Sequence, residues 1–410
     1  MSNVSSSNSQ GELVPELRFP EFSGEWKKKY VENFCKIQTG SGNTQDKESE
    51  GTYPFFVRSP VVEHSNKYIF DCEAVLTVGD GVGTGKVYHY INGKFNCHQR
   101  VYAMTNFEKS VCARYFFYHF QKIFPRQVFA MSAKTSVDSI RRNMIAQLNM
   151  ALPSINEQKK ITQFFTLIDS RIEKQNQLVN VLKSYKRGLL ARLFPKKGDT
   201  VPELRFKEFT ADWEQRKLSD IVDVLDGDRG KNYPTSIDFD DSGHTLFLNA
   251  SNVTNGGFLF QDNQFITEEK SNSMGNGKLE EDDIVITSRG SLGHIAWYNA
   301  DISRSVPYAR INSGMLILRN KKEVETEYLY HFMKSDKGQS QISFMSFGSA
   351  QPQLTKKGVE SLEVVLPPKS DEQLKIGDYF EYLDHLITLH QQKLDMYTTV
   401  KKYLLQKMFV

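Results

Sequence analysis

The sequence predicts an α+β protein in which two mixed α/β domains are separated by two long, antiparallel, coiled-coil-like helices with pseudo-twofold symmetry. Two repeats predict this fold class. Residues 152–194 recur, with the same spacing of apolar positions, at residues 366–409. The shorter stretch VPELRFPEFSGEW at residues 14–26 recurs as VPELRFKEFTADW at residues 201–213. The chain is therefore a doubled unit, and its 410 residues are enough for two domains.

The repeats also set the expected domain boundaries. The Ser/Asn-rich start is predicted to be a disordered tail, and the Pro- and Gly-containing stretch 195–200 to be a linker. The expected parts are the tail at 1–13, a first domain at 14–151, a first long helix at 152–195, a second domain at 201–365 and a second long helix at 366–410.

Each long stretch is predicted to be a helix with a defined start. Proline precedes it, and Ser154-x-x-Glu157 and Ser370-x-x-Gln373 have the spacing of a capping box. Positions three and four residues apart then form a seam suited to packing along another helix. The seam positions are Phe165, Ile168, Ile172, Gln175, Val179, Leu182, Lys186, Leu189 and Leu193 in the first copy, and Phe380, Leu383, Ile387, His390, Leu394, Tyr397, Lys401, Leu404 and Met408 in the second.

The two seams turn polar at matching places, at Gln175 and Lys186 in one copy and at His390 and Lys401 in the other. Because a polar seam residue fixes the register of a helix pair, we interpret the two helices as each other's partners. Two ordinary amphipathic core helices are the alternative.

The short repeat, residues 14–26 and 201–213, has little periodicity and high identity. Both features suggest a docking segment that lies in the same kind of groove twice. A recent duplication that has not yet diverged explains the identity equally well.

Between the docking segment and the long helix, the two halves differ more. Short runs of β-forming residues at 53–59, 71–77, 244–251 and 281–287 predict strands. Residues 139–148 match 353–362 with their apolar positions in step. Each half is therefore expected to be a mixed α/β globule of short strands and loops.

Composition limits the classes of function. Lys and Arg number 52 against 49 Asp and Glu, a net charge of only +3, so any nucleic-acid surface must be local. The four cysteines include no CxxC pair, which argues against a zinc site or a disulfide framework. The chain has no long apolar run and no signal peptide, so we expect a soluble, cytoplasmic protein.

The common catalytic motifs are absent. The glycine-rich run GDGVGTGK at residues 79–86 misses the phosphate-loop spacing by one residue, and Val87 follows where Ser or Thr is required. A plain turn, or a loop that lets backbone approach a ligand or DNA, explains it better. No two of the nine histidines are four residues apart, and Ser291 lacks the nucleophile-elbow pattern. We expect no catalytic residue, no metal site and no cofactor in this chain.

The doubled arrangement resembles the specificity subunit of type I restriction–modification systems. The likeness extends from Val14 to Phe409 and rests on the two Leu-Pro…Glu-Gln helix starts, the VPELRF repeats and the GSAQPQL run at residues 348–354. The first half departs from the pattern, with MSAKTS at residues 131–136 in place of the GSAQPQ run.

The resemblance implies a non-catalytic subunit whose two target recognition domains each read half of a bipartite DNA site. The helices would be a spacer roughly 60 Å long. Expected partners are double-stranded DNA, two modification (methyltransferase) subunits with S-adenosylmethionine, and restriction subunits with ATP and Mg²⁺.

Phosphate contacts need cations and small donors, and base readout needs Arg, Asn, Gln, Ser or Lys on loops. The alternative for each such residue is an ordinary solvated surface side chain or a turn former. The predicted DNA contacts are Arg58, Ser59, Lys94, Asn96, His98, Gln99, Arg100, Lys134, Ser136 and Arg141 in the first domain, and Arg229, Lys231, Asn249, Ser251, Asn252, Arg289, Ser291, Arg304, Arg310, Gln351 and Gln353 in the second.

The outer faces of the long helices are predicted to bind the partner subunits. The candidates are Ile161, Phe164, Leu190, Phe194, Ile376, Tyr379, Leu405 and Phe409, which could equally pack against the globular domains. A two-domain scaffold that binds proteins without reading DNA is the alternative function. An enzyme with a divergent site is the weaker third hypothesis.

Overall fold

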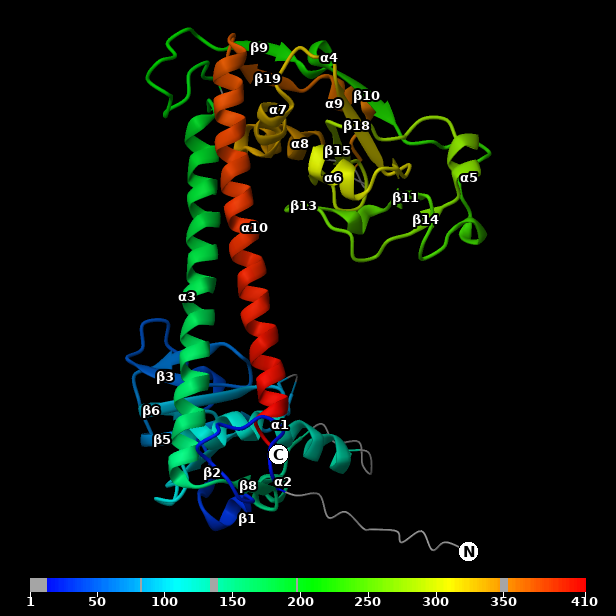
Figure 1. The fold of residues 1–410 in the computed structure, drawn as a ribbon. Coiled ribbons are helices and arrows are strands. Elements are labelled where there is room, and N and C mark those ends of the chain that lie inside the picture. Colours follow the sequence, from blue (N-terminus) through cyan, green and yellow to red (C-terminus); the bar gives the residue numbers. More distant parts are fainter. Residues whose placement is uncertain (1–12, 82, 133–138, 197, 347–352) are drawn as a thin grey trace, which may run out of the picture. The chain divides into compact units, whose positions relative to one another are not determined.

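The computed structural model describes residues 13–81, 83–132, 139–196, 198–346 and 353–410 (Figure 1). The predicted tail, residues 1–13, lies almost wholly outside them. The chain forms two compact units: unit 1 is Met1–Asn176 with Gln391–Val410, and unit 2 is Gln177–His390. Each unit contains one docking segment, one mixed α/β domain and parts of both long helices. Within the described ranges no helix has the length and apolarity needed to cross a membrane.

The long helices are α3, Ile155–Leu193, and α10, Ser370–Lys407. In unit 1 the start of α3 packs on the chain's end after α10, where the Phe165 and Phe409 rings lie 5.6 Å apart. In unit 2 the residue after α3 packs on the start of α10, where the Phe194 and Phe380 rings lie 5.9 Å apart. The pairing is therefore antiparallel in each unit. All predicted seam positions are buried or half-buried, which confirms the seam.

The start of α3 uses a different partner from the predicted capping box. The amide of Glu157 donates to Oγ of Ser154 at 3.3 Å, as expected, but the Glu157 carboxylate accepts two hydrogen bonds from Arg18. A charge-assisted pair with a guanidinium is stronger than a bond to a backbone amide. The capping box predicted at Ser370 is wrong, since Ser370 already lies in α10 and its hydroxyl donates to Glu325.

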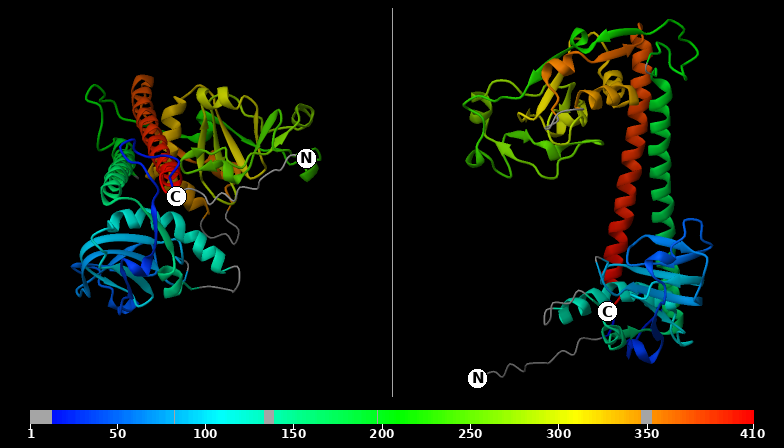
Figure 2. Two further views of the ribbon diagram at one scale, coloured as in Figure 1. Left: turned by 60° about the horizontal axis from the view of Figure 1, so that its bottom comes forward. Right: turned by 180° about the vertical axis from the view of Figure 1, so that it is seen from behind.

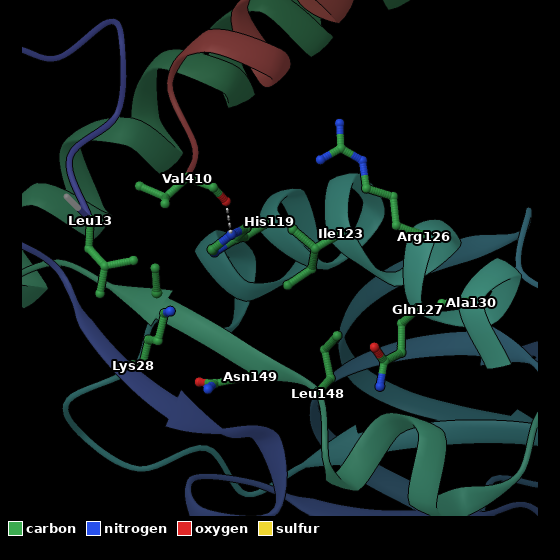
Figure 3. Close-up of a pocket in the computed structure, with 11 residues that line it drawn as sticks. Leu13, Lys28, His119, Ile123, Arg126, Gln127, Ala130, Leu148, Asn149 and Val410 are labelled. Atoms are coloured by element: carbon green, nitrogen blue, oxygen red, sulfur yellow. Dashed lines mark hydrogen bonds between the residues drawn. The ribbon is translucent and has the colours of Figure 1, made fainter. Parts of the chain in front are cut away.

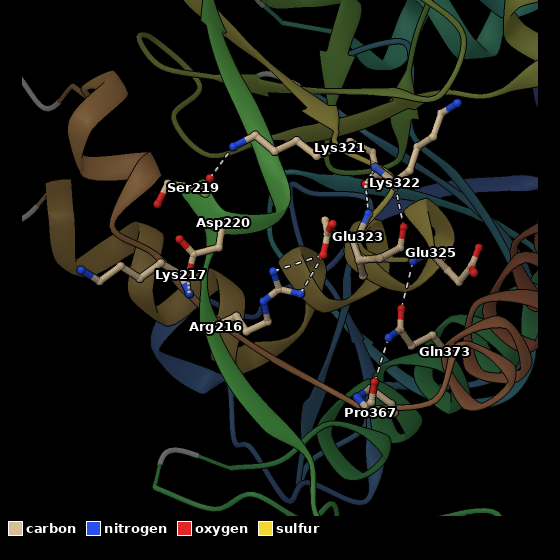
Figure 4. A network of polar contacts seen from close by, with 12 residues as sticks. Arg216, Lys217, Ser219, Asp220, Lys321, Lys322, Glu323, Glu325, Pro367 and Gln373 are labelled. Atoms are coloured by element: carbon tan, nitrogen blue, oxygen red, sulfur yellow. Dashed lines mark hydrogen bonds and ion pairs between the residues drawn. The ribbon is translucent and has the colours of Figure 1, made fainter.

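The glutamine of each Glu-Gln pair holds the connection into its helix. Gln373 donates to the carbonyl of Pro367 at 2.8 Å and accepts from the amide of Glu325 at 2.9 Å (Figure 4). Gln158 donates to the carbonyl of Pro153 and accepts from the amide of Cys112, both at 2.9 Å. The recurring Pro…Glu-Gln pattern therefore has a structural reason in both units.

Each docking segment lies in the same surroundings in its own unit. Arg18 pairs with buried Glu157, and Arg205 pairs with buried Glu372, each through bonds of 2.7 and 2.8 Å. Identical partners give a physical reason for the near-identity of residues 14–26 and 201–213, as the docking interpretation predicted.

The domain of unit 1 is built on a six-stranded sheet of order β2-β7-β5-β6-β3-β4, in which only β3 and β6 pair in parallel. Helix α1 packs on this sheet (Figure 2). Tyr115, Phe116 and Phe120 of this helix lie in the core. The elements are β1 Lys27–Tyr30, η1 Val31–Asn33, β2 Lys36–Thr39, η2 Thr44–Asp46, β3 Tyr53–Phe56, β4 Val62–Ser65, β5 Phe70–Val78, β6 Tyr88–Cys97, β7 Val101–Thr105, α1 Ala113–Ser132, α2 Arg142–Ala146 and β8 Asn149–Leu152.

The domain of unit 2 has a four-stranded antiparallel sheet of order β10-β18-β15-β16 and a three-stranded sheet of order β14-β11-β17. Its elements are β9 Glu214–Lys217, α4 Leu218–Ile221, β10 Val222–Asp226, η3 Ser236–Asp238, β11 Thr245–Leu248, η4 Ala250–Asn252, β12 Val253–Thr254, β13 Gly257–Phe258, β14 Phe265–Ile266, α5 Glu268–Ser273, β15 Asp283–Thr287, β16 Ile295–Tyr298, α6 Ala300–Ser305, β17 Ala309–Ile311, β18 Met315–Asn320, α7 Thr326–Lys334, α8 Asp336–Ser346, α9 Lys356–Glu360 and β19 Glu363–Leu366.

The two domains share one core. Strands β2, β7, β5 and β6 of unit 1 have the same order and antiparallel pairing as β10, β18, β15 and β16 of unit 2. Outside this core, the sheets differ in strand number and order. The strands expected at residues 53–59, 71–77, 244–251 and 281–287 are confirmed as β3, β5, β11 and β15.

Candidate nucleic-acid interface

In unit 1, polar side chains gather where the central strands meet their loops. Thr39, the last residue of β2, faces Tyr102, and Val78, the last residue of β5, faces Val101 at the start of β7. The amide of Gly79 donates to the carbonyl of Arg100 at 2.7 Å, and the amide of Ile140 donates to the carbonyl of Gly79 at 2.6 Å. We call this boundary the loop edge of unit 1.

The loop edge of unit 1 is rich in arginine. Arg58 Nη1 and Arg100 Nε each lie 3.6 Å from the carboxylate of Asp80. Gln99, Arg100 and Arg141 line one shallow pocket with Asp80. Five of the predicted DNA contacts, Arg58, Ser59, Gln99, Arg100 and Arg141, are therefore brought to one edge of the domain.

Unit 2 has a loop edge at the same place in the shared core. The amides of Ser288 and Arg289, just after β15, donate to the carbonyl of Gly314 at 2.8 and 3.2 Å, just before β18. The amide of Leu354 donates to the carbonyl of Ser288 at 3.0 Å, as Ile140 does to Gly79 in unit 1.

Arg229 joins this edge through a hydrogen bond of 3.2 Å to the carbonyl of Ser313. Its loop is held by Asp228, whose carboxylate accepts from the amides of Gly230 and Gly275 at 2.6 and 2.7 Å. These bonds lower the pKa of Asp228 and keep it ionised.

The parallel pair of β11 and β17 delivers further polar residues to this edge. Leu248 pairs with Ile311, so Asn249 and Asn312 leave their strands at the same end. The predicted contacts Arg229, Lys231, Asn249, Ser251, Arg289, Ser291 and Gln353 follow strand ends or lie in the loops of this region, and none of them is fully buried.

Four predicted DNA contacts are wrong because their side chains are buried: Asn96, His98, Asn252 and Arg310. Arg310 donates to the carbonyls of Ser271, Gly275 and Asn276, and burial lowers its pKa. Asn252 holds the turn after β11 through Leu259 and Asn249.

The other two lie on or next to β6. Asn96 donates to Oγ of Ser65 at 3.4 Å. His98 Nδ1 accepts from the amide of Arg100 at 3.0 Å, so His98 shapes the turn that presents Arg100. Burial, together with the charges of Arg58 and Arg100, lowers the pKa of His98.

Two predicted contacts are exposed but lie away from the loop edges. Lys94 faces Asp71 near the start of β5, whereas the edge is at the end of that strand. Arg304 lies on α6, which follows the end of β16, whereas the loop edge lies before the start of β16. The Arg304 side chain pairs with Asp301. Lys134, Ser136 and Gln351 lie outside the described residues.

The sequence interpretation missed Asp80. Matching residues 71–77 with 281–287 aligns Thr77 with Thr287. The strand registers instead match Val78 with Thr287. Val78 pairs with the first residue of β7, and Thr287 pairs with the first residue of β18. Asp80 then takes the place of Arg289. This register comes from the pairing of β5 with β7 and of β15 with β18, and a single sequence does not reveal which strands pair.

The prediction for partner binding is also wrong for four residues. Ile161 and Phe409 are buried in the core of unit 1, and Phe194 and Ile376 in the core of unit 2. Phe164, Leu405, Leu190 and Tyr379 are partly buried against the same cores. The alternative, packing against the globular domains, is what the structure shows.

A second pocket of unit 1 holds none of the predicted DNA contacts. Lys28, His119, Arg126 and Asn149 line it (Figure 3). His119 is fully buried, and its ring lies 3.4 Å from the carbonyl oxygen of Val410.

Comparison with protein families gives a match over most of the chain. The family model described as "Type I restriction modification DNA specificity domain" matches residues 23–184 and again residues 210–396. The two matches divide the chain at the linker between the two halves.

The chain is also similar to individual specificity subunits of type I restriction enzymes. The type I restriction enzyme MjaVIII specificity subunit of Methanocaldococcus jannaschii is 23% identical over 404 residues, covering 94% of this chain and 92% of the relative. The EcoDI specificity subunit of Escherichia coli is 21% identical over 388 residues, covering 88% of this chain and 82% of the relative.

Among solved structures, the S subunit of a type I restriction–modification system from M. genitalium has the same fold. The TM-score is 0.66 at 17% identity, and the alignment covers 97% of this chain and 99% of the other.

Proposed function

Because the chain belongs to the family of type I restriction–modification DNA specificity domains, we propose that it is the DNA-reading subunit of a type I restriction–modification complex. Each unit reads one half of a bipartite site. The observation that carries this proposal is the pair of loop edges. Two copies of one strand core carry arginines at the same edge, while the surrounding strands differ.

The chemistry of the loop edges suits DNA. Arginine side chains on loops can contact phosphates or bind guanine O6 and N7 with both ends of the guanidinium. Arg58, Arg100, Arg141, Arg229, Lys231 and Arg289 are all exposed. Lys134, Ser136 and Gln351 stay part of the proposal, as do the other predicted contacts at the loop edges: Ser59, Gln99, Asn249, Ser251, Ser291 and Gln353. Lys94 and Arg304, which lie away from the edges, do not.

The long helices act in this proposal as a spacer of fixed length. A continuous helix of 39 residues such as α3 is roughly 58 Å long at 1.5 Å per residue. Two readers attached to such a spacer would contact two short sequences separated by base pairs that neither reader touches.

The chain itself is proposed to be non-catalytic and to act in the cytoplasm. Two modification subunits would supply the methyltransferase and S-adenosylmethionine, and restriction subunits would supply ATP- and Mg²⁺-dependent cleavage. Apolar side chains that remain exposed on the helices are the proposed docking surface: Leu167, Met396, Val400 and Tyr403 in unit 1, and Leu178, Val181, Tyr185, Tyr382 and Leu389 in unit 2.

The test is adenine methylation across the genome in cells that carry the presumed methyltransferase, with and without this chain. We expect a split motif with a fixed gap that appears only with the chain. Arg100→Ala should relax one half-site and Arg289→Ala the other. Arg304→Ala is the matched control, since it removes the same charge away from the loop edge, and it should change neither half.

Unchanged methylation in the presence of the chain would refute DNA reading and favour the protein-binding scaffold. Methylation or cleavage by the purified chain alone would refute its non-catalytic role.

A further inference from the structure

Asp80 is a carboxylate placed among arginines at the loop edge of unit 1. Arg58 Nη1 lies 3.6 Å from Oδ1, and Arg100 Nε lies 3.6 Å from Oδ2. At this distance neither contact is a hydrogen bond. Oδ1 is buried and accepts no hydrogen bond from the described residues. The guanidinium groups therefore neutralise the carboxylate without hydrogen-bonding to it. Because Oδ1 is buried, Oδ2 is the oxygen that can accept a hydrogen bond from a ligand.

The position of Asp80 is informative because DNA is an anion. A carboxylate at a DNA-facing edge weakens binding to every phosphate backbone, so it adds nothing to general affinity. The matched position in unit 2 is Arg289, which follows its strand at the same distance. The two domains thus carry opposite charges at equivalent positions of a shared core. Such a difference is expected if the two domains recognise different bases.

We propose that Asp80 determines one letter of the half-site that unit 1 reads, by accepting a hydrogen bond from an exocyclic amino group in the major groove. This inference rests on the proposed function. The amino group is N4 of cytosine or N6 of adenine, the donors that the major groove presents. Guanine and thymine present acceptors at the equivalent place, which a carboxylate repels.

The neighbouring arginines complete the recognition. With its side chain 24% exposed, Asp80 lines the same pocket as Gln99, Arg100 and Arg141. An arginine can bind guanine while the carboxylate beside it accepts from an amino group. Together they would recognise one G·C pair, or guanine in one base pair and an amino group in the next. The charge of the carboxylate also favours positions of Arg58 and Arg100 on either side of it before DNA arrives, which reduces the entropy lost on binding.

The test is selection of binding sites from a random-sequence double-stranded DNA library by the complex with its methyltransferase partner. Asp80→Asn keeps the shape of the side chain and adds a donor. We expect its preference for cytosine or adenine at one position to fall roughly 10- to 100-fold, because the amide can also donate to guanine or thymine. The half-site that depends on Arg289 should not change. The other bases of the half-site that unit 1 reads should also be kept, and they report that unit 1 of the variant is folded.

Two further variants sharpen the result. Asp80→Glu keeps the charge but moves the oxygens by one methylene group, so the same letter should weaken. Asp71→Asn removes the same charge from an exposed position near the opposite end of β5, and should change no letter.

An unchanged preference in Asp80→Asn overturns the proposal. So does equal weakening on all sequences, which would make Asp80 only a positioning residue for the arginines. If the wild-type complex itself selects no split sequence, the failure belongs to the proposed function instead.

Discussion

Lys186 Nζ lies 2.6 Å from Oδ1 of Asp384, in the seam between α3 and α10 of unit 2. Lys401 and Asp169 form the same pair at 2.6 Å in unit 1. Both lysines were predicted as polar positions of the seam. A largely buried cation is stable only with its counter-ion in place, so each lysine favours one register of the helix pair.

Removing the counter-ion should therefore destabilise unit 2 more than removing the lysine. We expect Asp384→Asn to lower the free energy of unfolding by about 3 kcal/mol, since Lys186 is 8% exposed. Lys186→Met should have a smaller effect, because the Asp384 side chain is 39% exposed and can be hydrated. Urea unfolding measures both, with Asp378→Asn, an exposed site on α10, as control. A larger loss for Lys186→Met would contradict the argument.

His119 should make unit 1 sensitive to acid. Burial lowers its pKa to about 3, against about 6.5 in an unfolded chain. The unfolded state binds the extra proton between these values, so stability falls as pH decreases from 6.5 toward 3. We expect a loss of about 2 kcal/mol between pH 7 and pH 5 from this group.

His119→Gln should remove that part of the pH dependence in unfolding measured from pH 7 to pH 4. His64→Gln, an exposed site of the same unit, should leave it unchanged. Equal slopes for wild type and His119→Gln would show that His119 carries no such linkage.

Substitutions of exposed residues on α3 should affect partner binding, whereas substitution of the buried residue that follows α3 should affect folding. Val181 and Tyr185 are 63% and 50% exposed, and Phe194 is 2% exposed. Val181→Asp with Tyr185→Glu is expected to weaken co-purification of the methyltransferase and leave the melting temperature unchanged. Phe194→Ala should instead lower stability by about 3–5 kcal/mol, measured by urea unfolding. Normal co-purification of the double variant would place the docking surface elsewhere.

The spacer hypothesis predicts a change in gap length. Removing one heptad from each helix, residues 173–179 and 388–394, keeps the seam in phase and shortens each helix by about 10 Å. At 3.4 Å per base pair, the gap in the methylated motif should shorten by about three base pairs, with both half-sites unchanged. Altered half-site letters would show that the helices do more than set distance.

The doubled organisation and the paired helices follow from the sequence alone. Repeats and seam periodicity are local patterns, and an antiparallel pair needs no information beyond the two seams. The Glu-Gln helix starts were visible too, although their partners, Arg18 and Arg205 among them, lie far away in the sequence.

Only the tertiary structure decided which polar residues can meet DNA. Arg310 and Arg289 look alike in the sequence, yet one is buried under three backbone carbonyls and the other is exposed. The place of Asp80 depends on the register between β5 and β7, whose paired residues Val78 and Val101 are more than twenty positions apart in the sequence. Burial and register arise from contacts between distant segments, and a pattern of neighbouring residues carries no record of them.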